Sequence, residues 1–177
     1  MSDALSIQRQ ARGDVMVVTL QGNVTEDSTI DELKKDLKPI VIFNLEKVQR
    51  INSYGIRQWV NVMKEIRKEV QHLIFHRCPP IIVEQFNMIN NFGAGGLVYS
   101  IYMPYSCENC GKDELRLYTL PDGKSPDQTA AVPSLTCSAC SKPLTFNDIE
   151  EEYFYFLQHQ KGQSVPASAL DLLKSGS

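Results

Sequence analysis

The stretch that decides the fold is IVIFNLEKVQRINSYGIRQWVNVMKEIRKEV, residues Ile40 to Val70. It opens with the apolar and largely β-branched run Ile40 to Phe43, which predicts a strand buried on both faces. A polar turn is expected next, and beyond it apolar residues recur at steps of three and four, as in an amphipathic helix. They are Ile56, Trp59, Val60, Met63, Ile66 and Val70. A strand followed by a helix is half of a βαβ crossover.

Between this strand and this helix lies a corner, Asn-Ser-Tyr-Gly at residues 52–55. Asn52 or Ser53 is expected to accept a backbone N–H and cap the helix, while Gly55 lets the chain turn closely. The corner follows the carboxyl end of a strand, where open α/β sheets place their binding sites. We therefore take Asn52, Ser53, Tyr54 and Gly55 as a candidate partner-binding site.

The sequence on either side continues the alternation of strands and helices. Strands are expected from Ser6 to Gln10 and from Val15 to Leu20, joined by a Gly-Asp turn. Ser28 is expected to cap a short helix that ends before Pro39. Later in the chain we expect a strand over His72–Cys78, a helix over Ile82–Ile89 and a strand over Leu97–Met103. The predicted fold class is therefore α/β, with helices packed on a mixed sheet.

Composition and charge exclude several classes of protein. The chain has 177 residues, 42% of them hydrophobic, which is ordinary for a globular protein. No run approaches the roughly 20 apolar residues of a membrane span, and the start of the chain lacks the pattern of a secretory signal. We expect no membrane insertion and a cytoplasmic location. A formal charge of −3 gives no general attraction to nucleic acid or anionic lipid.

The order of elements over residues 5–104 is similar to that of a known family. The turn Val-Val-Thr-Leu-Gln-Gly-Asn, Val17 to Asn23, and the segment Phe43 to Ile56 also resemble the STAS domain, the fold of bacterial anti-sigma factor antagonists. Family members carry an Asp-Ser-Ser-Gly-like motif at the start of this helix, and a partner switch kinase phosphorylates its second Ser or Thr. The resemblance implies a non-enzymatic regulatory domain that docks a protein partner through the corner and the following helix.

The corner departs from the family motif at two positions. Asn52 stands where the motif has Asp, and Tyr54 stands where the phosphoacceptor is expected. A kinase pocket shaped for a short hydroxyl does not suit Tyr54, which leaves Ser53 as the candidate for phosphorylation at a helix N-terminus. The alternative for Asn52 and Ser53 is helix capping alone. For Tyr54, contact with a partner and packing over the helix end are both open.

The five cysteines predict a metal site. Cys78 stands alone, whereas the pairs Cys107/Cys110 and Cys137/Cys140 are two C-x-x-C motifs separated by 26 residues. Two such turns present four thiolates to one ion, which predicts a zinc ribbon with a structural Zn²⁺ and no open catalytic position. Iron and redox disulfides are the alternatives. Cys78 is expected to be a small packed residue.

These observations divide the chain into four parts. We expect a STAS-like α/β domain over residues 1–104, a zinc ribbon over 105–146, a C-terminal helix over 147–160 and a flexible tail over 161–177. Asn147, three residues before Glu150, is expected to cap the helix, whose predicted apolar face includes Ile149, Tyr153 and Phe156. The tail is rich in Pro, Gly and Ser, and its leucines Leu170, Leu172 and Leu173 are a candidate for a weak docking motif.

The sequence predicts a cytoplasmic protein-binding regulator and no enzyme. No Ser/His/Asp, paired-carboxylate or open-metal arrangement indicates catalysis, and His72 and His76 are interpreted as structural. The expected partner is an anti-sigma factor, a switch kinase or a signalling complex. One alternative is an accessory or scaffold subunit of a transporter or signalling assembly. Another, a nucleic-acid-binding ribbon, is disfavoured because residues 105–147 carry four basic and five acidic side chains. The sequence leaves the oligomeric state open.

Overall fold

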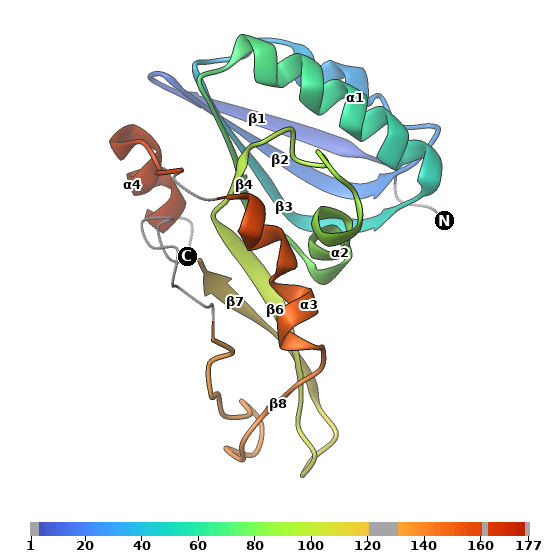
Figure 1. The fold of residues 1–177 in the computed structure, drawn as a ribbon, viewed down its shortest axis with the longest axis vertical. Coiled ribbons are helices and arrows are strands. Elements are labelled where there is room, and N and C mark those ends of the chain that lie inside the picture. Colours follow the sequence, from blue (N-terminus) through green and yellow to red (C-terminus); the bar gives the residue numbers. More distant parts are fainter. Residues whose placement is uncertain (1–3, 121–130, 161–162, 176–177) are drawn as a thin grey trace.

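The computed structural model describes residues 4–120, 131–160 and 163–175. It has a larger sheet with helix α1 lying across it, and a smaller sheet that extends away from the larger one (Figure 1). The predicted fold class is confirmed, because a mixed sheet carries the helices and four cysteines gather in a small appended module. Whether the domain boundaries fall where the sequence suggests stays a prediction.

The larger sheet has five strands arranged in their sequence order. They are β1 (Ser6–Arg12), β2 (Val15–Val24), β3 (Ile40–Ile51), β4 (His72–His76) and β5 (Leu97–Val98). β1 and β2 are antiparallel, and the other neighbours are parallel. Parallel neighbours need crossover connections, which are the 3₁₀ helix η1 (Ile30–Lys34), α1 (Ser53–Glu69) and α2 (Pro80–Met88).

One row of paired residues across the larger sheet forms the centre of the core. Val18 pairs with Phe43, Phe43 with Phe75, and Phe75 with Val98, and all four are buried. The ring centroid of Trp59, on α1, lies 5.8 Å from that of Phe43 and 6.2 Å from that of Phe75. The apolar face of α1 therefore packs on this row, as the helical spacing of its apolar residues predicts.

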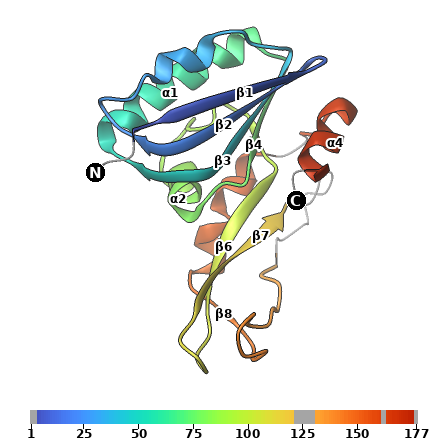
Figure 2. The same ribbon diagram turned by 180° about the vertical axis from the view of Figure 1, so that it is seen from behind.

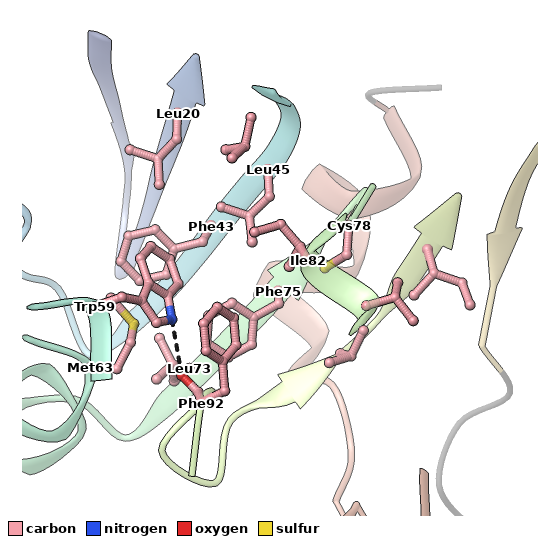
Figure 3. Packing of buried hydrophobic residues seen from close by; sticks show 14 of the residues in the cluster. Leu20, Phe43, Leu45, Trp59, Met63, Leu73, Phe75, Cys78, Ile82 and Phe92 are labelled. Carbon is pink, nitrogen blue, oxygen red and sulfur yellow. Dashed lines mark hydrogen bonds between the residues drawn. The ribbon is translucent and has the colours of Figure 1, made fainter. Parts of the chain in front are cut away.

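The indole of Trp59 has one polar atom, and the core provides its partner. Nε1 donates a hydrogen bond of 3.0 Å to the carbonyl oxygen of Phe92 (Figure 3). The ring of Phe92 also stacks on the indole, with centroids 5.6 Å apart. A buried N–H that has a partner avoids the cost of an unpaired donor. Trp59 thus joins α1 to the loop before β5 by both apolar and polar contacts.

The opposite face of the larger sheet is covered by α4 (Ala167–Ser175), which lies away from α1 (Figure 2). Ala169 and Leu173 of α4 are buried against Val15, Ile40, Ile42, Ile74 and Tyr99. Flexibility of the tail stays a prediction, whereas its leucine motif does dock, with Leu173 buried and Leu170 and Leu172 packed against the same cluster. Alternate strand residues point to opposite faces, so this face has an apolar patch that the leucines cover. Residues 161–162 and 176–177 lie outside the described residues.

β3 is longer than its apolar run predicts. It continues from Phe43 to Ile51, and the side chains of Leu45, Val48 and Ile51 are buried. The pairing with β2 shifts register twice along this extension, which breaks the strict alternation of apolar and polar residues. The predicted polar turn is therefore a bulged continuation of the strand, and the chain leaves the sheet only at Asn52.

The predicted helix after Ser28 is the short 3₁₀ helix η1, which has no side-chain cap. The Ser28 hydroxyl instead closes the preceding turn, since it accepts from the N–H of Thr25 at 2.8 Å and donates to the carbonyl of Asn23 at 3.0 Å. Ile30 and Leu33 are buried in the core that η1 shares with α1. The apolar pattern was thus correct, and the cap was wrong.

The single last strand predicted over Leu97–Met103 is divided at Tyr99. Beyond this point the chain forms a second sheet, with the order β7-β6-β8. Its strands are β6 (Ser100–Ser106), β7 (Asp113–Thr119) and β8 (Thr145–Phe146). β6 remains joined to the chain that follows β4 by two backbone hydrogen bonds. Cys78 N–H donates to the Ser100 carbonyl at 3.0 Å, and the Cys78 carbonyl accepts from Tyr102 N–H at 2.8 Å.

A polar cluster ties the two sheets together. Glu46, on β3, accepts hydrogen bonds from the Tyr102 hydroxyl of β6 and, at 3.0 Å, from the guanidinium of Arg77. The bond from Tyr102 and the charge of Arg77 hold the pKa of Glu46 below its usual value. The carboxylate therefore stays ionised at neutral pH between two donors that come from different parts of the chain.

The predicted C-terminal helix is two short pieces, α3 (Glu150–Tyr153) and η2 (Tyr155–His159). Asn147 caps neither piece, because its Oδ1 accepts from the Ser106 hydroxyl at 2.7 Å. Tyr153 and Phe156 are buried as predicted, but Ile149 is 55% exposed and does not share their face. Because the helix is broken after Tyr153, residues on either side of the break do not share one helical face.

A substitution at Gly55 tests how closely α1 approaches β2. A Cβ at this position would lie 2.2 Å from the carbonyl oxygen of Val24, to which Asn52 N–H also donates. We expect Gly55→Ala to lower the free energy of unfolding by about 2–3 kcal/mol, since backbone on both sides would have to move. Urea denaturation measures this change. The exposed control Ser53→Ala should stay within about 0.5 kcal/mol, and equal stability of the two variants would contradict the close approach.

Candidate functional site

Two loops meet at the end of the smaller sheet that points away from the larger one (Figure 1). Cys107 and Cys110 lie in the loop from β6 to β7, and Cys137 and Cys140 lie in the loop before β8. The four Sγ atoms all lie within 4.8 Å of one another. The structure thus brings together the four predicted ligands, and the cluster could hold a metal ion.

The two cysteine loops have the same backbone hydrogen bonds. In the first loop, Cys107 N–H donates to the Lys112 carbonyl at 2.9 Å, and its carbonyl accepts from Gly111 N–H at 2.8 Å. The second loop repeats both bonds at 2.8 and 2.9 Å, with Cys137, Lys142 and Ser141. Gly111 and Ser141 have positive φ angles of 72° and 58°. The repeated geometry shows that each C-x-x-C motif folds as the same tight turn.

The sulfur distances fit a thiolate metal site. Cys107 Sγ lies 3.4 Å from Cys140 Sγ, and Cys110 Sγ lies 3.6 Å from Cys137 Sγ. A disulfide has its sulfur atoms about 2.0 Å apart, and all four cysteines are free. Four thiolates at about 2.3 Å from a tetrahedral Zn²⁺ lie about 3.8 Å from one another. The donors therefore match a closed four-thiolate site in type, number and spacing.

Glu114, on β7, attaches the second cysteine loop to the sheet. Its Oε1 accepts from the Ser138 hydroxyl at 2.6 Å and from Ser138 N–H at 2.8 Å. These bonds, the hydroxyl first, lower the pKa of Glu114 to about 2. Its Oε2 pairs with Arg116 at 2.5 Å, and Arg116 donates to the Thr136 carbonyl at 3.0 Å. The sequence signal for this pair is the i, i+2 spacing of Glu114 and Arg116, which places both side chains on one face of a strand.

The corner lies where β3 passes into α1. Asn52 Oδ1 accepts from Gly55 N–H at 2.8 Å, so Asn52 rather than Ser53 caps the helix. The amide of Asn52 also donates to Glu26 at 2.6 Å. Ser53 is exposed, and the side chain of Tyr54 is 50% exposed. The corner is thus a hydrogen-bonded turn that presents a hydroxyl and an aromatic ring to solvent.

The two histidines of β4 have different environments. His72 is exposed, whereas His76 is only 7% exposed. The Nδ1 atom of His76 lies 2.8 Å from the Ser100 hydroxyl, which also accepts from Arg77 N–H at 2.8 Å. Burial lowers the pKa of His76 from 6.5 to about 4, so the ring is neutral at pH 7. This environment supports the structural interpretation of His76.

The two candidate sites belong to different sheets, the corner to the larger and the cysteines to the smaller. Neither protein-family models nor curated proteins give a match to this chain. The resemblance to the STAS domain therefore stays a prediction. In the part of the chain that the structure describes, no helix combines the length and apolar character that crossing a bilayer requires.

Removing one cysteine tests the metal site. We expect the protein purified without chelators to hold about one metal ion per chain, and Cys137→Ser to lose most of it, because three thiolates bind far more weakly than four. Elemental analysis of the purified protein measures the stoichiometry. The control is Cys78→Ala, whose thiol is buried outside the cluster. Equal metal content in the two variants would rule out this assignment.

The pH dependence of stability tests the environment of His76. The folded-state pKa of about 4 lies below the unfolded value near 6.5. The unfolded chain therefore binds more protons between these values, and stability falls as pH drops, by at most about 1.4 kcal/mol per pH unit. His76→Asn should remove this component of the slope of unfolding free energy between pH 6.5 and 4. The exposed control His72→Asn should keep it, and an unchanged slope in His76→Asn would contradict the assignment.

Proposed function

We propose that this protein is a non-enzymatic regulatory module that binds another protein through the corner and the exposed side of α1. The observation that carries the proposal is the capped corner, which offers Ser53 and Tyr54 to solvent at the end of a parallel strand. Binding sites of α/β sheets commonly occupy this position. The order of strands and helices around it also agrees with the order expected of a STAS-like domain.

Partner switching is the mode of regulation that the resemblance suggests. The partner would be an anti-sigma factor, a switch kinase or a related signalling complex. Tyr54 occupies the position of the usual phosphoacceptor, and its half-exposed ring can anchor an interface, because an aromatic side chain buries a large area at low entropic cost. In this proposal the contact is no longer controlled by phosphorylation at residue 54.

Ser53 provides a separate means of control. Its hydroxyl is exposed at the N-terminus of α1, whose first turn carries no acidic residue. A phosphate there would gain from the helix dipole and from the free N–H groups of the first turn. Because Asn52 already caps the helix, this hydroxyl is not needed as a cap. Mass spectrometry of protein from its native cell identifies the modification.

The proposed metal in the cysteine cluster is Zn²⁺, with a structural role. The four thiolates complete a tetrahedron and leave no position for water or substrate. The ion would join the loop between β6 and β7 to the loop before β8. Zinc here would stabilise a module that supports protein contacts, and catalysis forms no part of the proposal.

Substitutions of Tyr54 test the proposed function. We expect Tyr54→Ala and Tyr54→Asp to weaken binding to the partner recovered from native cells about tenfold or more, because truncation of an interface anchor typically costs about 1–3 kcal/mol. Calorimetry with the purified partner measures the affinity. The matched control is Tyr155→Ala, which removes a ring of similar exposure, 46%, from η2. If both Tyr54 variants bind as tightly as the wild type, the corner is not the docking surface.

A further inference from the structure

A groove runs between α2 and the segment that leads into α3, two parts of the chain that lie side by side in both views (Figures 1 and 2). Its volume is about 560 Å³. Side chains of both kinds line it, apolar and acidic, and the most important are Ile81, Glu84, Met88, Asp148 and Glu152. None of these residues belongs to the corner or to the cysteine cluster.

The apolar part of the groove is open to water. Met88, which lines it beside the partly buried Ile81, is 71% exposed. Covering such side chains removes apolar surface from water and favours association. A methionine has an unbranched, flexible side chain, which adapts to helices of different sequence. The groove therefore offers one adaptable apolar side chain.

All the charged side chains that line the groove are acidic. Glu84, Asp148 and Glu152 line it, and no lysine or arginine does. In the described ranges, none of these three carboxylates takes part in an ion pair. Three unpaired carboxylates around an apolar contact attract cationic side chains and repel acidic ones. An occupant that brings lysine or arginine would complement this charge.

The two walls of the groove are held in place before any ligand binds. Asn87, on α2, donates from its amide to the Tyr153 carbonyl at 3.1 Å and accepts from Phe156 N–H at 2.9 Å. These two bonds attach α2 directly to α3 and η2. A groove with fixed walls loses little conformational entropy when it is occupied, which favours binding.

We propose that this groove binds a basic amphipathic helix of another protein. The apolar side of the helix would lie on Met88 and Ile81, and lysine or arginine residues along its edges would pair with Glu84 and Glu152. This surface is independent of the corner. The protein would thus hold two partners, or two segments of one partner, at separate places.

Charge reversal in the groove tests the proposal. The probe is a fluorescent, helix-forming peptide of leucine and lysine whose leucines fall on one helical face, and its affinity for the full zinc-loaded chain is measured by anisotropy. We expect Glu84→Lys/Glu152→Lys to weaken binding about tenfold or more, because attraction becomes repulsion. The control, Asp27→Lys/Glu69→Lys, makes the same change in net charge at exposed residues outside the groove and should stay within about twofold. Equal loss in both variants would overturn the proposal.

A second measurement needs no substitution in the groove. The methyl carbon of Met88, labelled with ¹³C, should shift when the wild-type protein is titrated with the peptide, whereas buried Met63 should not. An unmoved Met88 signal at saturation would overturn the proposal. Sedimentation of the protein alone separates a further outcome. If the wild type is a dimer that Glu84→Lys/Glu152→Lys dissociates, a second copy fills the groove and the proposed occupant is wrong.

Discussion

The contact between Trp59 and the aromatic row of β3 and β4 is the constraint on which the rest of the structure depends. It fixes α1 on the sheet at its middle, while the hydrogen bond from the indole to the Phe92 carbonyl holds the loop before β5. With α1 fixed in this way, its first turn meets β2 with no room for a side chain at Gly55. The position of the exposed corner is therefore a consequence of packing in the core.

The smaller sheet is an extension of the same core. Ile101, Met103 and Tyr105 of β6 are buried in the hydrophobic cluster that contains Trp59 and Phe43. The backbone N–H and carbonyl of Cys78 both form hydrogen bonds with β6. Glu46 adds hydrogen bonds with Tyr102 and Arg77 at the same junction. Apolar packing thus secures the near end of the smaller sheet. Only the far end, with the cysteine loops, depends on thiolate chemistry.

Local patterns predicted the elements that local forces decide. The apolar run and the helical spacing within residues 40–70 predicted β3 and α1, and the two C-x-x-C motifs predicted the thiolate cluster. The extension of β3 was missed because register shifts in its pairing with β2 interrupt the alternation of apolar and polar residues. The break at Tyr99 and the helical form of the tail's leucine motif were missed because both depend on distant partners. A nine-residue helix such as α4 is marginal alone, and its contacts with Ile40, Ile42 and Ile74 stabilise it.

The two-residue strand β8 connects the second cysteine loop to one wall of the groove at α2. It follows the second cysteine loop directly and leads the chain into α3, where Tyr153 packs on Phe146 with ring centroids 5.3 Å apart. The segment that forms one wall of the groove is therefore only a few residues along the chain from the second cysteine loop. The short segment between the second cysteine loop and α2 is thus fixed at both ends, by the ring contact of Tyr153 with Phe146 and by the hydrogen bond from Asn87.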